Sequence, residues 1–102
     1  MRINFERTGG FLGMRLAVEV MTETLTPEEA DEMETLIERA RFFDLPAMLS
    51  AQTGQADRFQ YKVTVEKGDL FHTVETSESA APETLQPLIE HLTSAARTRR
   101  VN

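Results

Sequence analysis

The 102-residue chain is long enough for one hydrophobic core, and we expect a single domain over residues 1–102. Seventeen acidic side chains against eleven basic ones give a formal net charge of −6, which disfavours binding to the phosphate backbone of nucleic acids. No cysteine is present, so the sequence offers neither a disulfide framework nor a thiolate metal site.

The first predicted element is a β-hairpin. Apolar residues alternate with polar or small ones, as in half-buried strands, at Ile3, Phe5, Leu12, Met14, Leu16, Val18 and Val20. Glycine tolerates the positive φ of hairpin turns, so a two-residue turn at Gly9 and Gly10 would set Ile3 opposite Leu16, and Phe5 opposite Met14. A four-residue loop over residues 9–12 keeps the same inward face, so both turns remain open.

An amphipathic helix is predicted over residues 27–42. Thr26 suits the N-cap, Pro27 suits the first helical position, and Glu29 completes a capping box. An apolar stripe follows at three- and four-residue spacing, formed by Ala30, Met33, Leu36, Ile37 and Ala40. The segment FFDLP at residues 42–46 should end the helix, because the residue before a proline disfavours helical geometry.

A long connection and a second hairpin come next. Residues 47–57 are small and polar, and such connections are usually functional or mobile. Alternation then resumes at Phe59, Tyr61, Val63, Val65, Leu70, His72 and Val74. A two-residue turn at Lys67 and Gly68 would set Leu70 opposite Val65 and continue that register down the hairpin.

The last predicted element is a helix over residues 82–96. Its apolar stripe is Leu85, Leu88, Ile89, Leu92 and Ala96, and Pro87 is expected to distort its first turns. The element order is therefore β-β-α-β-β-α. This order predicts an α+β fold in which two hairpins form a four-stranded, mainly antiparallel sheet with both helices on one face.

No catalytic constellation is visible in the sequence. Catalysis needs a nucleophile with a base, a carboxylate pair in a cleft, or a metal with three or more ligands, so we expect neither an enzyme nor a cofactor. His72 has inward parity and is predicted to be a hydrogen-bonded structural histidine, while His91 is placed on the solvent side of its helix. The acids of the first helix and the arginines at 97, 99 and 100 are interpreted as solvated.

Targeting signals are also absent from the sequence. Residues 1–6 lack the apolar run of a signal peptide, and no segment approaches membrane-spanning length. We therefore expect a cytoplasmic protein that does not contact a membrane.

The glycine-rich segment between the first two strands is the candidate binding site. Its glycines do not form a dinucleotide fingerprint, because the segment joins two strands and no helix follows it. Phe11 has the parity opposite to Leu12, which places its ring at the hairpin tip or on the solvent side. Two interpretations remain: the ring folds back over an edge of its own sheet, or it anchors a partner protein.

The chain resembles the emfourin family. The matching segments follow in order through nearly the whole sequence, and the most specific are the Gly-Gly-Phe and double-phenylalanine pieces. They are RTGGFLG (7–13), LTPEEA (25–30), FFDLP (42–46), DRFQY (57–61), HTV (72–74), and Pro82 with Leu85, Pro87, Leu88 and Leu92.

This resemblance implies a protein inhibitor of thermolysin-type zinc metallopeptidases of the protealysin subgroup, with the zinc belonging to the target. It also implies a contact loop in the first hairpin, which we take as Thr8, Gly9, Gly10, Phe11, Leu12 and Gly13. The other matches, Phe42, Phe43, Leu45, Pro46 and Tyr61, are assigned mainly to the core. We expect a monomer. The alternative function is a general protein-interaction module with a non-peptidase partner.

Overall fold

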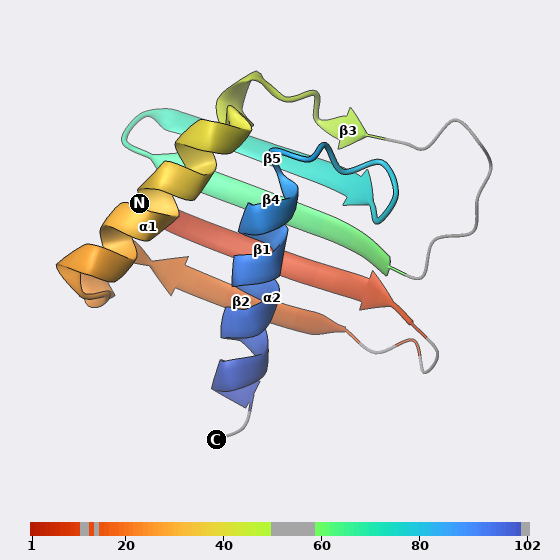
Figure 1. Cartoon of the computed structure of the whole chain (residues 1–102), viewed down its shortest axis with the longest axis horizontal. Helices are drawn as coiled ribbons and strands as arrows, with labels where there is room; N and C mark the ends of the chain where they lie inside the picture. Colours follow the sequence, from red (N-terminus) through yellow and green to blue (C-terminus); the bar gives the residue numbers. More distant parts are fainter. Residues whose placement is uncertain (11–12, 14, 50–58, 101–102) are drawn as a thin grey trace.

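A five-stranded sheet is covered on one face by two helices (Figure 1). The computed structural model describes residues 1–10, 13, 15–49 and 59–100. The sheet has the order β2-β1-β4-β5-β3, with strands β1 (Arg2–Gly9), β2 (Leu16–Met21), β3 (Met48–Leu49), β4 (Phe59–Lys67) and β5 (Leu70–Ser77). The helices are α1 (Pro27–Ala40) and α2 (Gln86–Arg100), with short 3-10 turns η1 (Thr22–Thr24) and η2 (Phe42–Asp44). The predicted α+β class is confirmed.

The prediction of four strands missed a fifth strand, β3, at one edge of the sheet. β3 pairs parallel with β5, with Met48 beside Glu75 and Leu49 beside Thr76. The Glu75 N–H also donates to the Ala47 carbonyl at 2.8 Å. A two-residue strand is too short to show an alternating pattern, which is why sequence periodicity missed it. The long connection therefore begins with a strand, and its residues 50–58 lie outside the described residues.

The first hairpin has the predicted inward face but another register. Ile3 lies opposite Val20 and Phe5 opposite Val18, so both pairings that the two-residue turn required are wrong. The reason is that β1 continues to Gly9, which pairs with Phe59 of β4 and so belongs to the sheet. A register shift by an even number of residues leaves every side chain on its original face, so parity was preserved.

The second hairpin shows the same kind of shift. Val65 lies opposite His72, and Lys67 opposite Leu70, so the turn consists of Gly68 and Asp69 and not of Lys67 and Gly68. Gly68 has φ of +59°. A positive φ at the first central residue alone is typical of a type II′ turn, which favours glycine at that position.

The core lies between the apolar face of the sheet and the two helices. Four of the sheet residues that the parity argument placed inward, Leu16, Val18, Val63 and Val65, are buried with exposed fractions of 8% or less. The inward placement of Leu70 was wrong: next to the turn at the end of the hairpin, it is 54% exposed. α1 adds Met33, Ile37 and Ala40, and α2 adds Leu88, Ile89, Leu92 and Ala96. Burying an apolar side chain of this size contributes about 1.5–3 kcal/mol.

The start of α1 is the capping box that the sequence predicts. The Thr26 hydroxyl accepts from the Glu29 N–H at 3.2 Å, and the Glu29 carboxylate accepts from the Thr26 N–H at 3.1 Å. The bond from the Thr26 N–H, together with one that the Thr26 hydroxyl donates to the same carboxylate at 3.0 Å, holds the pKa of the Glu29 carboxyl below its ordinary value. The helix ends at Ala40, before the predicted boundary, because Arg41 adopts a left-handed conformation with φ of +50°.

The start of α2 differs from the prediction. Residues 83–85 form a turn, in which the Leu85 N–H donates to the Pro82 carbonyl at 2.9 Å, and the helix begins at Gln86. Pro87 therefore lies in the first turn, where its missing N–H would have had no helical partner. For this reason, Pro87 does not distort the helix as expected. Within the described residues, neither helix is long and apolar enough to cross a bilayer.

Candidate functional site

The predicted contact loop lies at one end of the sheet, where β1 ends and β4 begins (Figure 1). Thr8 and Gly9 are the last residues of β1, and Gly9 pairs with Phe59, the first residue of β4. Gly10 and Gly13 are also described, whereas Phe11 and Leu12 lie outside the described residues. The roles of these two side chains therefore remain predictions.

The described glycines of this loop share a backbone conformation that other residues avoid. Gly9, Gly10 and Gly13 have φ angles of +100°, +87° and +63°. The Gly13 N–H donates to the Gly10 carbonyl at 3.1 Å, which holds the two ends of the loop together. A side chain at any of these positions would be strained, so the three glycines are required by the backbone path.

A row of aromatic rings supports the base of the loop. The ring centroids of Phe5 and Tyr61 are 6.0 Å apart, and those of Tyr61 and Phe59 are 6.4 Å apart. The Arg7 guanidinium lies 4.2 Å from the centroid of Phe59, a cation–π contact. A Cβ atom added to Gly10 would lie 3.0 Å from Cε1 of Phe59. The Phe59 ring thus occupies the space that a side chain at position 10 would need.

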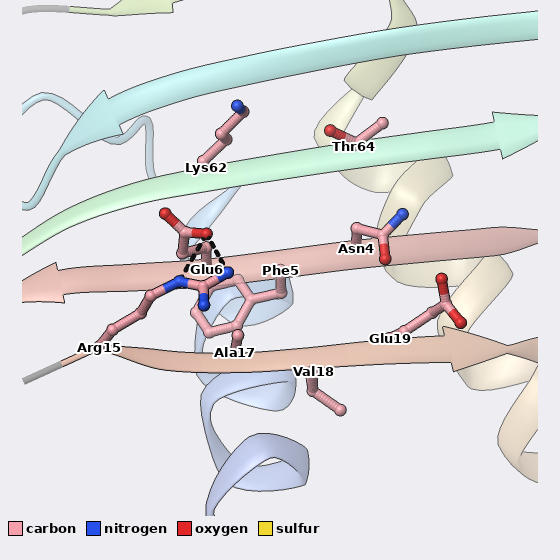
Figure 2. Close-up of a pocket in the computed structure, with 9 residues that line it drawn as sticks. All are labelled: Asn4, Phe5, Glu6, Arg15, Ala17, Val18, Glu19, Lys62 and Thr64. Carbon is pink, nitrogen blue, oxygen red and sulfur yellow. Dashed lines mark hydrogen bonds and ion pairs between the residues drawn. The ribbon is translucent and has the colours of Figure 1, made fainter.

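The sheet face opposite the helices has a shallow polar depression near the same end (Figure 2). Its lining residues are Asn4, Phe5, Glu6, Arg15, Ala17, Val18, Glu19, Lys62 and Thr64. Within it, Oε2 of Glu6 accepts hydrogen bonds from Arg15, at 2.9 Å from Nε and 2.7 Å from Nη2. Arg15 precedes β2, so this pair ties the far side of the loop to β1. An exposed ion pair of this kind contributes about 0–1 kcal/mol.

Both histidines contact neighbouring elements. Nε2 of His72 donates to the Leu45 carbonyl at 2.6 Å, and the His72 ring packs edge-to-face on Phe42 with centroids 5.7 Å apart. The predicted structural role of His72 is therefore confirmed. His91 is half-buried, and its Nδ1 lies 3.3 Å from Oε1 of Glu32 on α1, so its placement on the solvent side was wrong.

The structure also tests the remaining assignments of the resemblance. Phe42 is buried in the core, and Phe43, Leu45 and Tyr61 pack against it half-buried. Pro46 is exposed, so its assignment to the core was wrong. Among the described residues, no group of three or more His, Cys, Asp or Glu is placed to hold a metal ion.

Arg7 is the supporting residue that sequence reasoning missed. It continues the inward alternation of Ile3 and Phe5, and that parity was the available signal that its stem would face the aromatic row.

A comparison with protein-family models agrees with this arrangement. A family model described as Emfourin matches residues 5–93. The chain belongs to the emfourin family. The match includes the glycine loop, β1 from Phe5 onward, all of β2 and the aromatic row beneath the loop. Comparisons with curated proteins and with solved structures found no match. Membership in this inhibitor family supports a role for the chain as a metallopeptidase inhibitor and is consistent with a protein that is not an enzyme.

Proposed function

We propose that this emfourin-family chain inhibits a thermolysin-type zinc metallopeptidase of the protealysin group by placing residues 8–13 in the active-site cleft. The family match over residues 5–93 carries the proposal. The zinc belongs to the peptidase, and in this mechanism the inhibitor itself needs no cofactor. Its function is to occupy the cleft and exclude substrate.

The geometry of the loop supports this use. Glycines without side chains allow a backbone to approach a narrow cleft closely. The Phe59 ring, which leaves no room for a side chain at Gly10 and is itself contacted by Arg7, supports the base of the loop before binding. A fixed loop loses little conformational entropy on association, so more of its contact energy appears as affinity.

Phe11 is the proposed anchor of the loop. Its role rests on its outward parity and on its position in the family-matching Gly-Gly-Phe segment, because it lies outside the described residues. Burying a phenylalanine in a partner is worth about 2–3 kcal/mol. The Phe11→Ala variant should therefore inhibit a protealysin-like peptidase about 10–100-fold more weakly.

The matched control is Phe71→Ala. Phe71 is 66% exposed and lies on β5, near the opposite end of the sheet from the loop. Its truncation should leave the inhibition constant unchanged, and the thermal midpoint should hardly move in either variant. Equal inhibition by wild type and Phe11→Ala would show that Phe11 does not contribute to the interface. A large loss of stability in Phe11→Ala would show that Phe11 belongs to the core.

We further propose that the inhibitor acts as a monomer in the cytoplasm. Light scattering coupled to size-exclusion chromatography tests the monomer, and cell fractionation tests the compartment. A gene for a protealysin-like peptidase beside that of the inhibitor would favour a peptidase target over another protein partner. Recovery of the protein only from the extracellular medium would overturn the cytoplasmic assignment.

A further inference from the structure

Strand β2 forms an open edge of the sheet. Among the described residues it pairs with β1 and with no other strand, whereas β3 covers part of β5 at the opposite edge. Natural proteins usually protect such an edge with proline, lysine, a bulge or a covering segment. The β2 sequence, LAVEVM, contains neither proline nor lysine, and its one charged residue is Glu19.

The hydrogen bonds at the end of β2 show which of its backbone groups face this edge. The Thr22 N–H donates to the Met1 carbonyl at 3.0 Å. Because alternate residues of an antiparallel strand bond to the same neighbour, the even-numbered residues of β2 bond to β1. Ala17 therefore directs its backbone N–H and C=O away from β1. The carbonyl of Met21 accepts from the Thr24 hydroxyl at 2.7 Å, which marks where the edge ends.

Helix α2 crosses the inner face of β2, and its last turn continues past that strand (Figure 1). Beside this overhanging end is a hollow of about 300 Å³ between the two helices and the end of β2. Apolar groups from Val20, Leu25 and Met33 line it, and α2 contributes the small side chains of Ser94 and Ala95. The polar side chains of Glu29, His91 and Thr98 complete the lining. A strand added to β2 would run beneath the overhang and point one inward side chain toward this hollow.

We propose that the β2 edge binds an extended segment of another polypeptide, which adds a strand to the sheet and places an apolar side chain in the hollow. Main-chain hydrogen bonds to Ala17 would supply affinity, and the hollow would supply side-chain specificity. This site is separate from the glycine loop and does not depend on a peptidase target.

A second copy of this chain fits the edge less well than a single strand. Two copies paired through β2 about a two-fold axis would bring their overhanging α2 ends to the same side of the joined sheet. Arg97 in the last turn of each helix is exposed, so like charges would meet. A single strand has no such helix and meets no such repulsion.

The test uses Ala17→Pro against Ala17→Val. Proline removes the N–H that faces the edge but leaves the β1 ladder intact, and proline is tolerated on edge strands. Valine changes the same exposed side chain and keeps the N–H. Phage-displayed heptapeptides are selected on the immobilised wild-type chain, and the selected peptides are then synthesised. They should bind wild type and Ala17→Val equally and bind Ala17→Pro at least tenfold more weakly, which corresponds to about 1.4 kcal/mol.

Ala95→Leu tests the hollow without altering the edge. The added side chain should fill the hollow and weaken the same peptides about tenfold, and this variant decides the matter if Ala17→Pro fails to fold. Phe11→Ala should bind the peptides like wild type, because the glycine loop is a different site.

Three results would overturn the proposal. Selection could yield no binding peptide, or the peptides could bind Ala17→Pro and Ala95→Leu as tightly as wild type. A dimer in sedimentation equilibrium that Ala17→Pro dissociates would assign the edge to self-association.

Discussion

Replacing Gly10 with alanine tests how the loop is supported. Gly10 has φ of +87°, and a Cβ atom there would lie 3.0 Å from Cε1 of Phe59. Gly13 has φ of +63°, and a Cβ atom there would meet nothing within 4 Å. The two positions therefore share the backbone strain, while only Gly10 adds a contact with the aromatic row. Gly13→Ala is the matched control.

The expected losses of stability follow from these two effects. A residue with a Cβ atom in the left-handed region costs about 1–2 kcal/mol, which applies to both variants. In Gly10→Ala the Phe59 ring must also shift by a few tenths of an ångström. Distorting a side chain away from its preferred rotamer angle costs about 0.5–1.5 kcal/mol. The ring cannot yield freely because the Arg7 guanidinium lies 4.2 Å from its centroid. Gly10→Ala should therefore lose about 1 kcal/mol more than Gly13→Ala, because only the displacement of the ring differs between them.

Urea denaturation of both variants measures this difference, with the slope m compared to confirm that the unfolded states match. In a domain of this size, 1 kcal/mol moves the thermal midpoint by about 4–8 °C. The double variant Gly10→Ala/Phe59→Leu should recover the excess loss, because the smaller side chain leaves room for the methyl group. Equal losses in Gly10→Ala and Gly13→Ala would refute the argument that Phe59 supports the loop.

Four further outcomes are expected. Phe42→Ala, at a side chain 1% exposed, should lower the free energy of unfolding by about 3–5 kcal/mol in urea titration. Thr26→Ala should cost about 1 kcal/mol through the loss of the α1 cap, seen as a lower thermal midpoint. The pKa of the Glu29 carboxyl is held below its ordinary value of 4.5. The ionised carboxylate therefore stabilises the fold fully above pH 4.5, and this contribution is lost as the pH falls through the lowered pKa. The difference in stability between wild type and Glu29→Gln should accordingly shrink in acid. His72→Leu should cost about 1–3 kcal/mol, because the Leu45 carbonyl loses its donor, and calorimetry would measure it.

The inward faces of the strands could be predicted from the sequence, but their registers could not. Alternation reports parity alone, and a shift by two or four residues satisfies it equally well. Gly9, which the two-residue turn required at the tip, instead pairs with Phe59, a contact between residues distant in sequence. For the same reason β3 was invisible: its two residues are held by pairing with β5 and not by a local pattern.

The two ends of α1 were predicted with different success, because only one of them is set by a local sequence motif. The capping box of Thr26 and Glu29 is contained within four residues, and it was predicted correctly. The end of α1 is set by the left-handed conformation of Arg41, a residue type that gives no sign of such a turn.

The candidate loop was found from its glycines. Its support by Arg7 and Phe59 required the strand order β2-β1-β4, which periodicity does not supply.

The central position of β1 has a consequence for how the chain acquires its structure. Of the five strands described, β1 is synthesised before the others, yet its second neighbour is β4, and Arg2 and Glu66 meet across a separation of 64 positions. Each hairpin closes between residues close in sequence, but joining β1 to β4 must overcome the entropy of closing the whole intervening chain. During synthesis on a ribosome, the edge of β1 that pairs with β4 therefore stays unpaired until β4 emerges. The aromatic row beneath the glycine loop forms only at that late step.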